Sequence, residues 1–75
     1  MSNPTTSTWT AEILPDENPG SQPLWEDSGY PDQEAARLAA AAVVGRAGDV
    51  LGCDDRVRDN DGTVVAVVRT ANAAA

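Results

Sequence analysis

The segment from Asp32 to Gly48, DQEAARLAAAAVVGRAG, constrains the fold of this chain more than any other stretch. Its interior is mostly alanine, which loses no side-chain entropy when it becomes helical. Asp32 is suited to cap the first turn, because its carboxylate can accept hydrogen bonds from the free backbone amides there. Gly48 is suited to the left-handed position that ends many helices. The segment therefore predicts one helix, on which the rest of the chain must pack.

Winding this helix at about 3.6 residues per turn separates two faces. The predicted core face is small and apolar and consists of Ala36, Ala39, Ala40, Val43 and Ala47. Leu38 falls near the polar side, so we expect it to be exposed. With Ala41 and Ala42 it offers an alternative use of the helix, as a surface for self-association. Arg37 is placed to pair with Glu34, which lies one turn earlier on the same side.

Short runs on both sides of the helix predict strands. Residues 8–14 alternate between apolar and polar side chains, with Trp9 on the core side, as in a half-buried strand. Residues 24–26 are expected to form a short second strand, followed by a turn into the helix at residues 27–31. After the helix, residues 49–55 are expected to be a connection.

The last part of the chain predicts a β-hairpin over residues 56–70. Its turn is Asn60-Asp61-Gly62, in which the glycine can take the positive φ that such turns need. Residues 64–68, VVAVV, follow this turn and are apolar on both faces, which predicts a strand in the centre of the sheet.

These elements predict an α+β fold. One alanine-rich helix packs on a three- or four-stranded, mainly antiparallel sheet, in the chain order β-(β)-α-β-β. We expect a single domain over residues 8–70, a disordered arm at residues 1–7 and a frayed tail at residues 71–75. A chain of 75 residues buries only a modest core, and formation of a homodimer is one way to add to it.

The charge balance is strongly acidic. Five arginines, no lysine and twelve acids give a net charge of −7. Nucleic acids and anionic membranes are bound by clustered cations, so neither is expected as a direct partner. A protein with a basic surface is favoured by long-range attraction, although excess acid also keeps a small protein soluble. No apolar run approaches ~20 residues and no signal-peptide pattern is present, so we expect a cytoplasmic protein.

Most catalytic and metal-binding chemistries lack their residues in this sequence. Without histidine or lysine, a Ser–His–Asp arrangement and a Schiff base are excluded. Cys53 is the only cysteine, so it forms neither an intramolecular disulfide nor a zinc site, and we interpret it as a small filler or a spectator thiol. The segment Asp59-Asn60-Asp61-Gly62 resembles part of a calcium loop, but Val57 and Val68 would occupy required ligand positions. We therefore expect no enzyme activity, cofactor or metal.

What remains is binding to another protein. The candidate binding residues are Trp25, Leu38, Asp54, Asp55, Asp59 and Asp61. Trp25 lies in a proline-rich, acid-flanked segment, and tryptophan is enriched among binding hot spots, although closing the small core is the more ordinary use of such a residue. We predict a small acidic protein-binding module with an accessory or regulatory role. The alternatives are an acidic nucleic-acid mimic, whose acids copy a phosphate backbone and inhibit a DNA- or RNA-binding protein, and a self-associating structural protein.

The succession WTAEIL, YPDQEAARLAAAA and VRDNDGTVVAVVRT resembles small single-helix α+β domains of actinobacteria and their phages. Those domains combine a strand or hairpin, an alanine-rich helix that opens on a capping residue, and a final strand with an Asp-Gly turn. The resemblance spans residues 9–70 and implies the α+β fold. It implies no agreed activity, so no functional residue is carried over from it.

Overall fold

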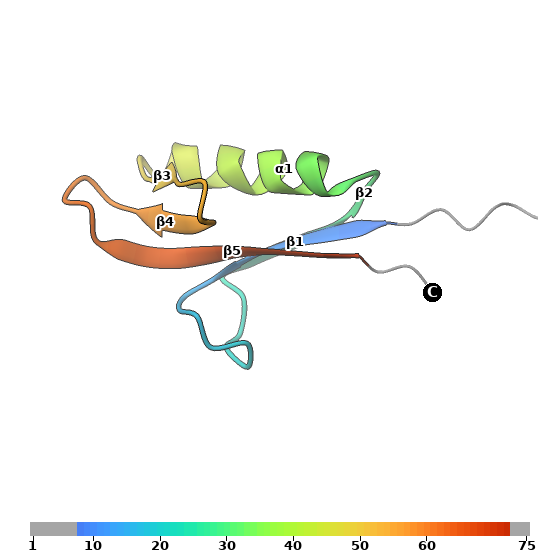
Figure 1. Ribbon diagram of the computed structural model, residues 1–75, viewed down its shortest axis with the longest axis horizontal. Helices are drawn as coiled ribbons and strands as arrows, with labels where there is room; N and C mark the ends of the chain where they lie inside the picture. Colours follow the sequence, from blue (N-terminus) through green and yellow to red (C-terminus); the bar gives the residue numbers. More distant parts are fainter. Residues whose placement is uncertain (1–7, 73–75) are drawn as a thin grey trace, which may run out of the picture.

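The computed structural model describes residues 8–72, which have an α+β fold. One helix, α1 (Gln33–Arg46), follows the strands β1 (Trp9–Leu14) and β2 (Trp25–Tyr30) and precedes β3 (Val50–Leu51), β4 (Arg56–Arg58) and β5 (Val64–Asn72). The strands form one sheet in the order β2-β1-β5-β4-β3, and all neighbouring strands are antiparallel. The helix covers one face of the sheet, and the loop between β1 and β2 lies on the other side (Figure 1).

Both ends of the helix form as the sequence predicts. Asp32 Oδ1 accepts a hydrogen bond from the backbone amide of Ala35 at 2.7 Å. At the other end, Gly48 has a φ of +85°. Its amide donates to the carbonyl of Gly45 at 3.0 Å, and the amide of Asp49 donates to the carbonyl of Val44 at 3.3 Å. These two bonds are the Schellman pattern, which satisfies carbonyl groups that the helix itself leaves unpaired.

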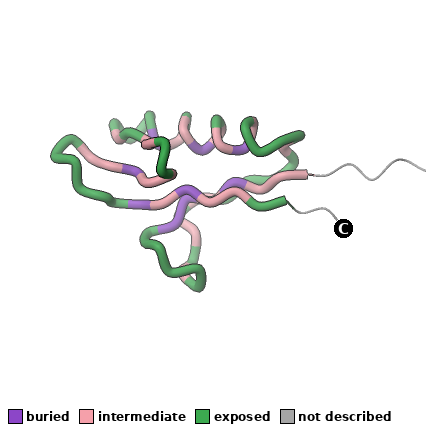
Figure 2. Tube along the Cα trace, in the orientation of Figure 1, coloured by how far each residue is buried: buried purple, intermediate pink, exposed green. Residues whose placement is uncertain are grey.

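The core lies between the helix and the sheet, where Figure 2 shows the buried segments of both layers facing each other. It consists of Ala11, Ile13, Ala36, Ala40, Val44, Val57, Ala66 and Val68. The central position of β5 confirms the prediction from its apolar run, because β5 pairs with β1 on one side and with β4 on the other. Alanine at helix positions 36 and 40 allows the helix backbone to lie close to the sheet.

The contact face of the helix differs from the prediction at its C-terminal end. Ala36 and Ala40 are buried as expected, but Val44 is buried where the prediction placed Ala47, which is exposed. Residues four apart lie nearly above one another on a helix, so a row at 36, 40 and 44 follows the sheet below it. The expected exposure of Leu38 is confirmed, since 59% of its surface is accessible.

The sheet has five strands, whereas three or four were predicted. Residues 50–51, expected to be a connection, form β3, in which Val50 pairs with Arg58 and Leu51 with Val57. This prediction was wrong because a two-residue strand is defined by its partner and not by its own sequence pattern.

The second strand is longer than predicted. Residues 27–30, expected to be a turn, continue β2 and pair Asp27 with Ala11 and Tyr30 with Trp9. The pairing is irregular between these two points, where Gly29 has a φ of +94°. β5 extends to Asn72, two residues beyond its predicted end. The predicted arm at residues 1–7 and the last three residues of the predicted tail lie outside the described residues.

Candidate functional site

An apolar groove of about 370 Å³ opens between the C-terminal half of α1 and the sheet. Its lining side chains come from α1 and the residues just after it, and from β1, β4 and β5. Leu24 and Trp25, at the start of β2, complete the lining. The lining also includes Ile13, Val43, Ala47 and Val65. Asp49 is the only charged residue of the lining among the described residues. The groove can therefore accept an apolar group, with one carboxylate beside it.

Leu24 stands at the mouth of this groove, with 67% of its surface exposed. Its backbone amide donates to the carbonyl of Ile13 at 2.7 Å, which fixes the point where the chain joins the sheet. Trp25, the next residue, is partly buried and packs against the core. Trp25 thus contributes to the core, as one interpretation of the sequence predicts, and also lines the groove.

Asp54, a predicted binding residue, holds an arginine. Arg58 donates to both of its carboxylate oxygens, at 3.1 Å and 2.8 Å, and the amide of Arg56 donates to Asp54 Oδ1 at 3.1 Å. The Arg58 side chain and, next, the Arg56 amide hold the pKa of Asp54 well below its ordinary value. The same pairing with Asp54 raises the pKa of Arg58.

Asp55 connects the loop between β3 and β4 to the helix. Arg37 Nε donates to Asp55 Oδ1 at 2.6 Å, and Arg37 Nη2 donates to the carbonyl of Gly52 at 2.6 Å. Asp55 itself has a φ of +64°. The predicted pairing of Arg37 with Glu34 was wrong, because the loop presents two acceptors to Arg37 and surface pairs along one helix are weak.

Asp59 is used by the hairpin turn. Its Oδ1 accepts from the backbone amides of Asp61 and Thr63, at 2.9 Å and 3.0 Å. Gly62 has a φ of +83°, as predicted for this position. Asp61 is exposed at the tip of the turn. The segment is therefore built as a turn, and its carboxylates do not converge.

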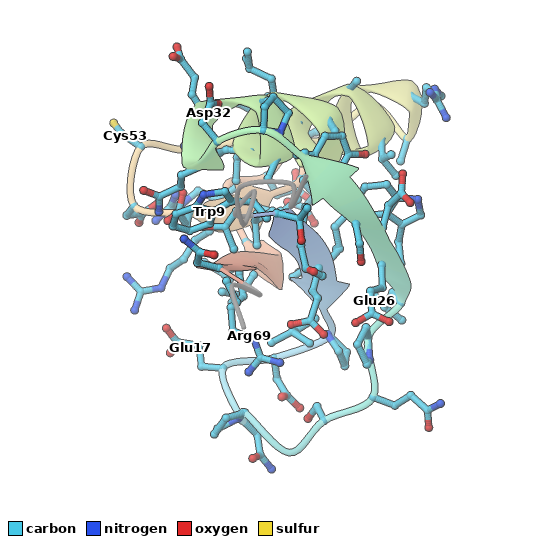
Figure 3. All side chains as sticks on the ribbon, turned by 90° about the vertical axis from the view of Figure 1, so that its right-hand side faces the viewer. Trp9, Glu17, Glu26, Asp32, Cys53 and Arg69 are labelled. Carbon is cyan, nitrogen blue, oxygen red and sulfur yellow. The ribbon has the colours of Figure 1, made fainter. Side chains whose placement is uncertain are left out.

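The face of the sheet away from the helix carries further ion pairs. Arg69 Nη2 lies 2.7 Å from Glu12 Oε1, and Arg56 Nε donates to Glu17 Oε1 at 3.0 Å. Glu17 belongs to the loop between β1 and β2, so its pair holds this loop to the sheet. Figure 3 shows Glu17 and Arg69 on the side of the sheet away from the helix. In the described part of the chain, the arginines at positions 37, 56, 58 and 69 thus form ion pairs with Glu12, Glu17, Asp54 and Asp55.

The acids of β2 have different surroundings. Glu26 is exposed, and no described arginine forms an ion pair with it or with Asp27. Asp27 accepts from the hydroxyl of Tyr30 at 2.8 Å and from the amide of Ser28 at 3.0 Å. The bond to Asp27 raises the pKa of Tyr30. Negative charge is therefore available along β2, next to the groove.

The remaining candidate residues lie apart from this region. Leu38 lies on the outer side of α1, and Ala42, also exposed, follows one turn later. Cys53 is exposed, so it is not a core filler.

Within residues 8–72 no group of three or more His, Cys, Asp or Glu side chains is arranged to hold a metal ion. No helix among these residues is long and apolar enough to cross a membrane.

Comparisons of this chain with protein-family models, with curated proteins and with solved structures give no match. The resemblance to single-helix domains of actinobacteria and their phages therefore stays a prediction. The groove brings together Trp25, a candidate residue that the sequence indicated, and Leu24, which the sequence interpretation did not include among the candidates. The available indication was a large apolar residue beside a tryptophan in a segment otherwise rich in proline and polar residues.

Proposed function

We propose that this chain is a non-enzymatic protein-binding module that accepts an apolar side chain of its partner in the groove beside Trp25. The observation that supports this most is the exposure of Leu24 at the mouth of that groove. Covering the apolar surface around a groove gives a partner a favourable binding free energy, because this surface is removed from water and the groove is filled by packed atoms.

The electrostatic surroundings favour a basic partner. The chain carries a net charge of −7, and Asp49 lies in the groove lining. Such a field attracts a positively charged protein from a distance and raises its association rate. An apolar contact that fills the groove then slows dissociation. Among the described residues no second ionisable side chain joins Asp49 in the lining, which is the reason for proposing binding and not catalysis.

The nucleic-acid mimic receives less support than this module. A mimic needs carboxylates that are free to meet the basic residues of its target. Asp54 and Asp55 are instead held by arginines of the same chain, which neutralise their charge. A target would have to displace these contacts before it could use the acids.

Selection of peptides tests the proposal, with two matched variants of the 75-residue protein. A random peptide library displayed on phage is enriched on the wild type, and the enriched peptides are measured against Leu24→Asp and Leu38→Asp. Both variants place the same new charge at an exposed leucine, on different surfaces. We expect the peptides to lose binding to the Leu24→Asp variant and to keep binding to the Leu38→Asp variant. Loss of binding to Leu38→Asp alone, equal binding to both variants, or no enrichment would contradict the proposal.

A further inference from the structure

The strand β2 forms one edge of the sheet. It pairs with β1 on one side, and among residues 8–72 no strand pairs with its other side. An unpaired edge can take up another extended segment through backbone hydrogen bonds, and this is a common way in which domains bind peptides. The first residue of β2 is Trp25, so a strand added here lies directly beside the apolar groove.

We propose that the partner adds an extended basic segment to β2 as a sixth strand, and that one apolar side chain of this segment enters the groove. This inference rests on the proposed function and deepens it, because it names the conformation and the charge of the partner segment. Backbone pairing supplies general affinity, and the side chains opposite Trp25, Glu26 and Asp27 supply specificity.

The pairing of β2 with β1 defines which face each of these side chains occupies. Trp25 pairs with Ile13 and Asp27 with Ala11, both buried on the helix side of the sheet. Glu26 pairs with Glu12, which forms its ion pair on the other side. Along β2, an added strand therefore lies first beside the apolar Trp25 on the helix side of the sheet. It then lies beside Glu26 on the opposite face and beside Asp27 on the helix side.

The complementary segment has an apolar residue opposite Trp25 and basic residues opposite Glu26 and Asp27. Opposite charges that face each other across strands stabilise the pairing. Antiparallel pairing is slightly more stable than parallel pairing. In that direction the partner segment has two basic residues, opposite Asp27 and then Glu26, followed by the apolar residue opposite Trp25. The irregularity near Gly29 limits regular addition to the first part of β2.

The same acids select against a second copy of this chain. If β2 paired with β2 of another molecule, the acids at positions 26 and 27 would lie close to their own counterparts. Like charges that face each other across strands are destabilising. The other edge of the sheet, β3, has only two residues and offers little to pair with. A basic peptide is therefore the occupant that the charges of β2 fit.

The test uses the full chain, labelled with nitrogen-15, and short capped peptides that contain Lys-Arg-Leu between threonine and valine residues. We expect binding to shift the backbone amide signals of residues 25–28 and to slow hydrogen exchange of those amides in this stretch that point away from β1. A peptide with Glu-Glu-Leu in place of Lys-Arg-Leu should bind at least roughly tenfold more weakly, since two attractive cross-strand charge pairs are replaced by two repulsive ones. The double variant Glu26→Lys with Asp27→Lys should reverse this preference.

Two N-methylated peptides separate strand addition from binding by side chains alone. N-methylation on alternate residues removes the backbone donors on one edge of the peptide, and the two peptides differ in which edge is blocked. Strand addition predicts that one of them loses binding and that the other keeps it. Equal tolerance of both, with binding still lost in Leu24→Asp, would overturn strand addition and leave groove binding intact. No binding by any of these peptides, together with failure of the library to enrich, would overturn both proposals.

Discussion

Two pairs of acids that are neighbours in the sequence have opposite surroundings in the structure: Glu26 with Asp27, and Asp54 with Asp55. Asp54 and Asp55 each hold an arginine, and through these contacts they fix the loop between β3 and β4 against the helix and the sheet. Glu26 and Asp27 lie on an edge strand and form no ion pair with the described arginines. One pair serves the fold, and the other leaves its charge at the surface.

The difference follows from where the arginines of this chain lie. Arg56 and Arg58 follow Asp54 closely in the chain, and Arg37 reaches Asp55 from the helix. No arginine lies on β2. Of the acids that the sequence indicated as binding residues, Asp54 and Asp55 are therefore the two that form ion pairs.

Replacement of Asp55 by alanine should give the largest loss of stability among these acids. The ion pair with Arg37 is partly exposed, so its removal should cost about 1 kcal/mol. Alanine at a φ of +64° should cost about 1 kcal/mol more, because the left-handed conformation is unfavourable for it. We therefore expect the free energy of unfolding to fall by about 2 kcal/mol in total, measured by urea denaturation.

Asp55→Gly is the matched control, since glycine accepts positive φ but cannot hold Arg37. It should lose less stability than Asp55→Ala. If the two variants were equally stable, backbone conformation at this position would contribute nothing. If both matched the wild type, Arg37 would not fix the loop.

Replacement of Asp54 by asparagine should change how stability depends on pH. The pKa of Asp54 lies below its ordinary 3.8 in the folded chain, so its carboxylate contributes stability above about pH 4 and loses it as the pH falls further. Asp54→Asn should therefore lower the melting temperature near neutral pH and reduce the further decrease between about pH 5 and pH 2. Parallel melting curves of variant and wild type across this range would show that Asp54 has no special role.

Replacement of Leu24 by aspartate should have the smallest effect on stability. Because 67% of Leu24 is exposed, we expect a change within about 0.5 kcal/mol, even though the variant should lose peptide binding. Trp25 is a poorer site for this test, since it also packs against the core. A loss of several kcal/mol in Leu24→Asp, measured by urea denaturation, would mean that the leucine belongs to the core and not to a binding surface.

The helix and the hairpin could be predicted from sequence because local chemistry defines them. The Asp32 cap, the left-handed Gly48 and the Asp-Gly turn each depend on residues within a few positions. The lengths of β2 and β3 could not be predicted, because both depend on their partner strands. Glu26 and Asp27 have low strand propensity, yet they lie in a strand because β1 pairs with them.

The candidate site was predictable only in part. Trp25 was recognisable as a residue type that recurs in binding sites. Leu24 was indicated only by its position beside Trp25, and its part in the groove depends on the helix and the sheet together. The role of Asp55 depends on Arg37, which lies eighteen residues earlier in the chain. Sequence spacing favoured Glu34 as the partner of Arg37, because only neighbours along the helix can be inferred without the fold.

The most direct measurement compares two double variants by urea denaturation at neutral pH: Glu26→Gln with Asp27→Asn, and Asp54→Asn with Asp55→Asn. Each removes two negative charges, so the net charge of the two proteins is the same. We predict that the β2 variant unfolds within about 0.5 kcal/mol of the wild type. The carbonyl oxygen of the amide introduced at position 27 can still accept from the amide of Ser28, and its NH2 group can donate to the hydroxyl of Tyr30. The loop variant should unfold at a clearly lower urea concentration. Equal losses in the two variants would contradict the division between acids that hold the fold and acids that remain available to a partner.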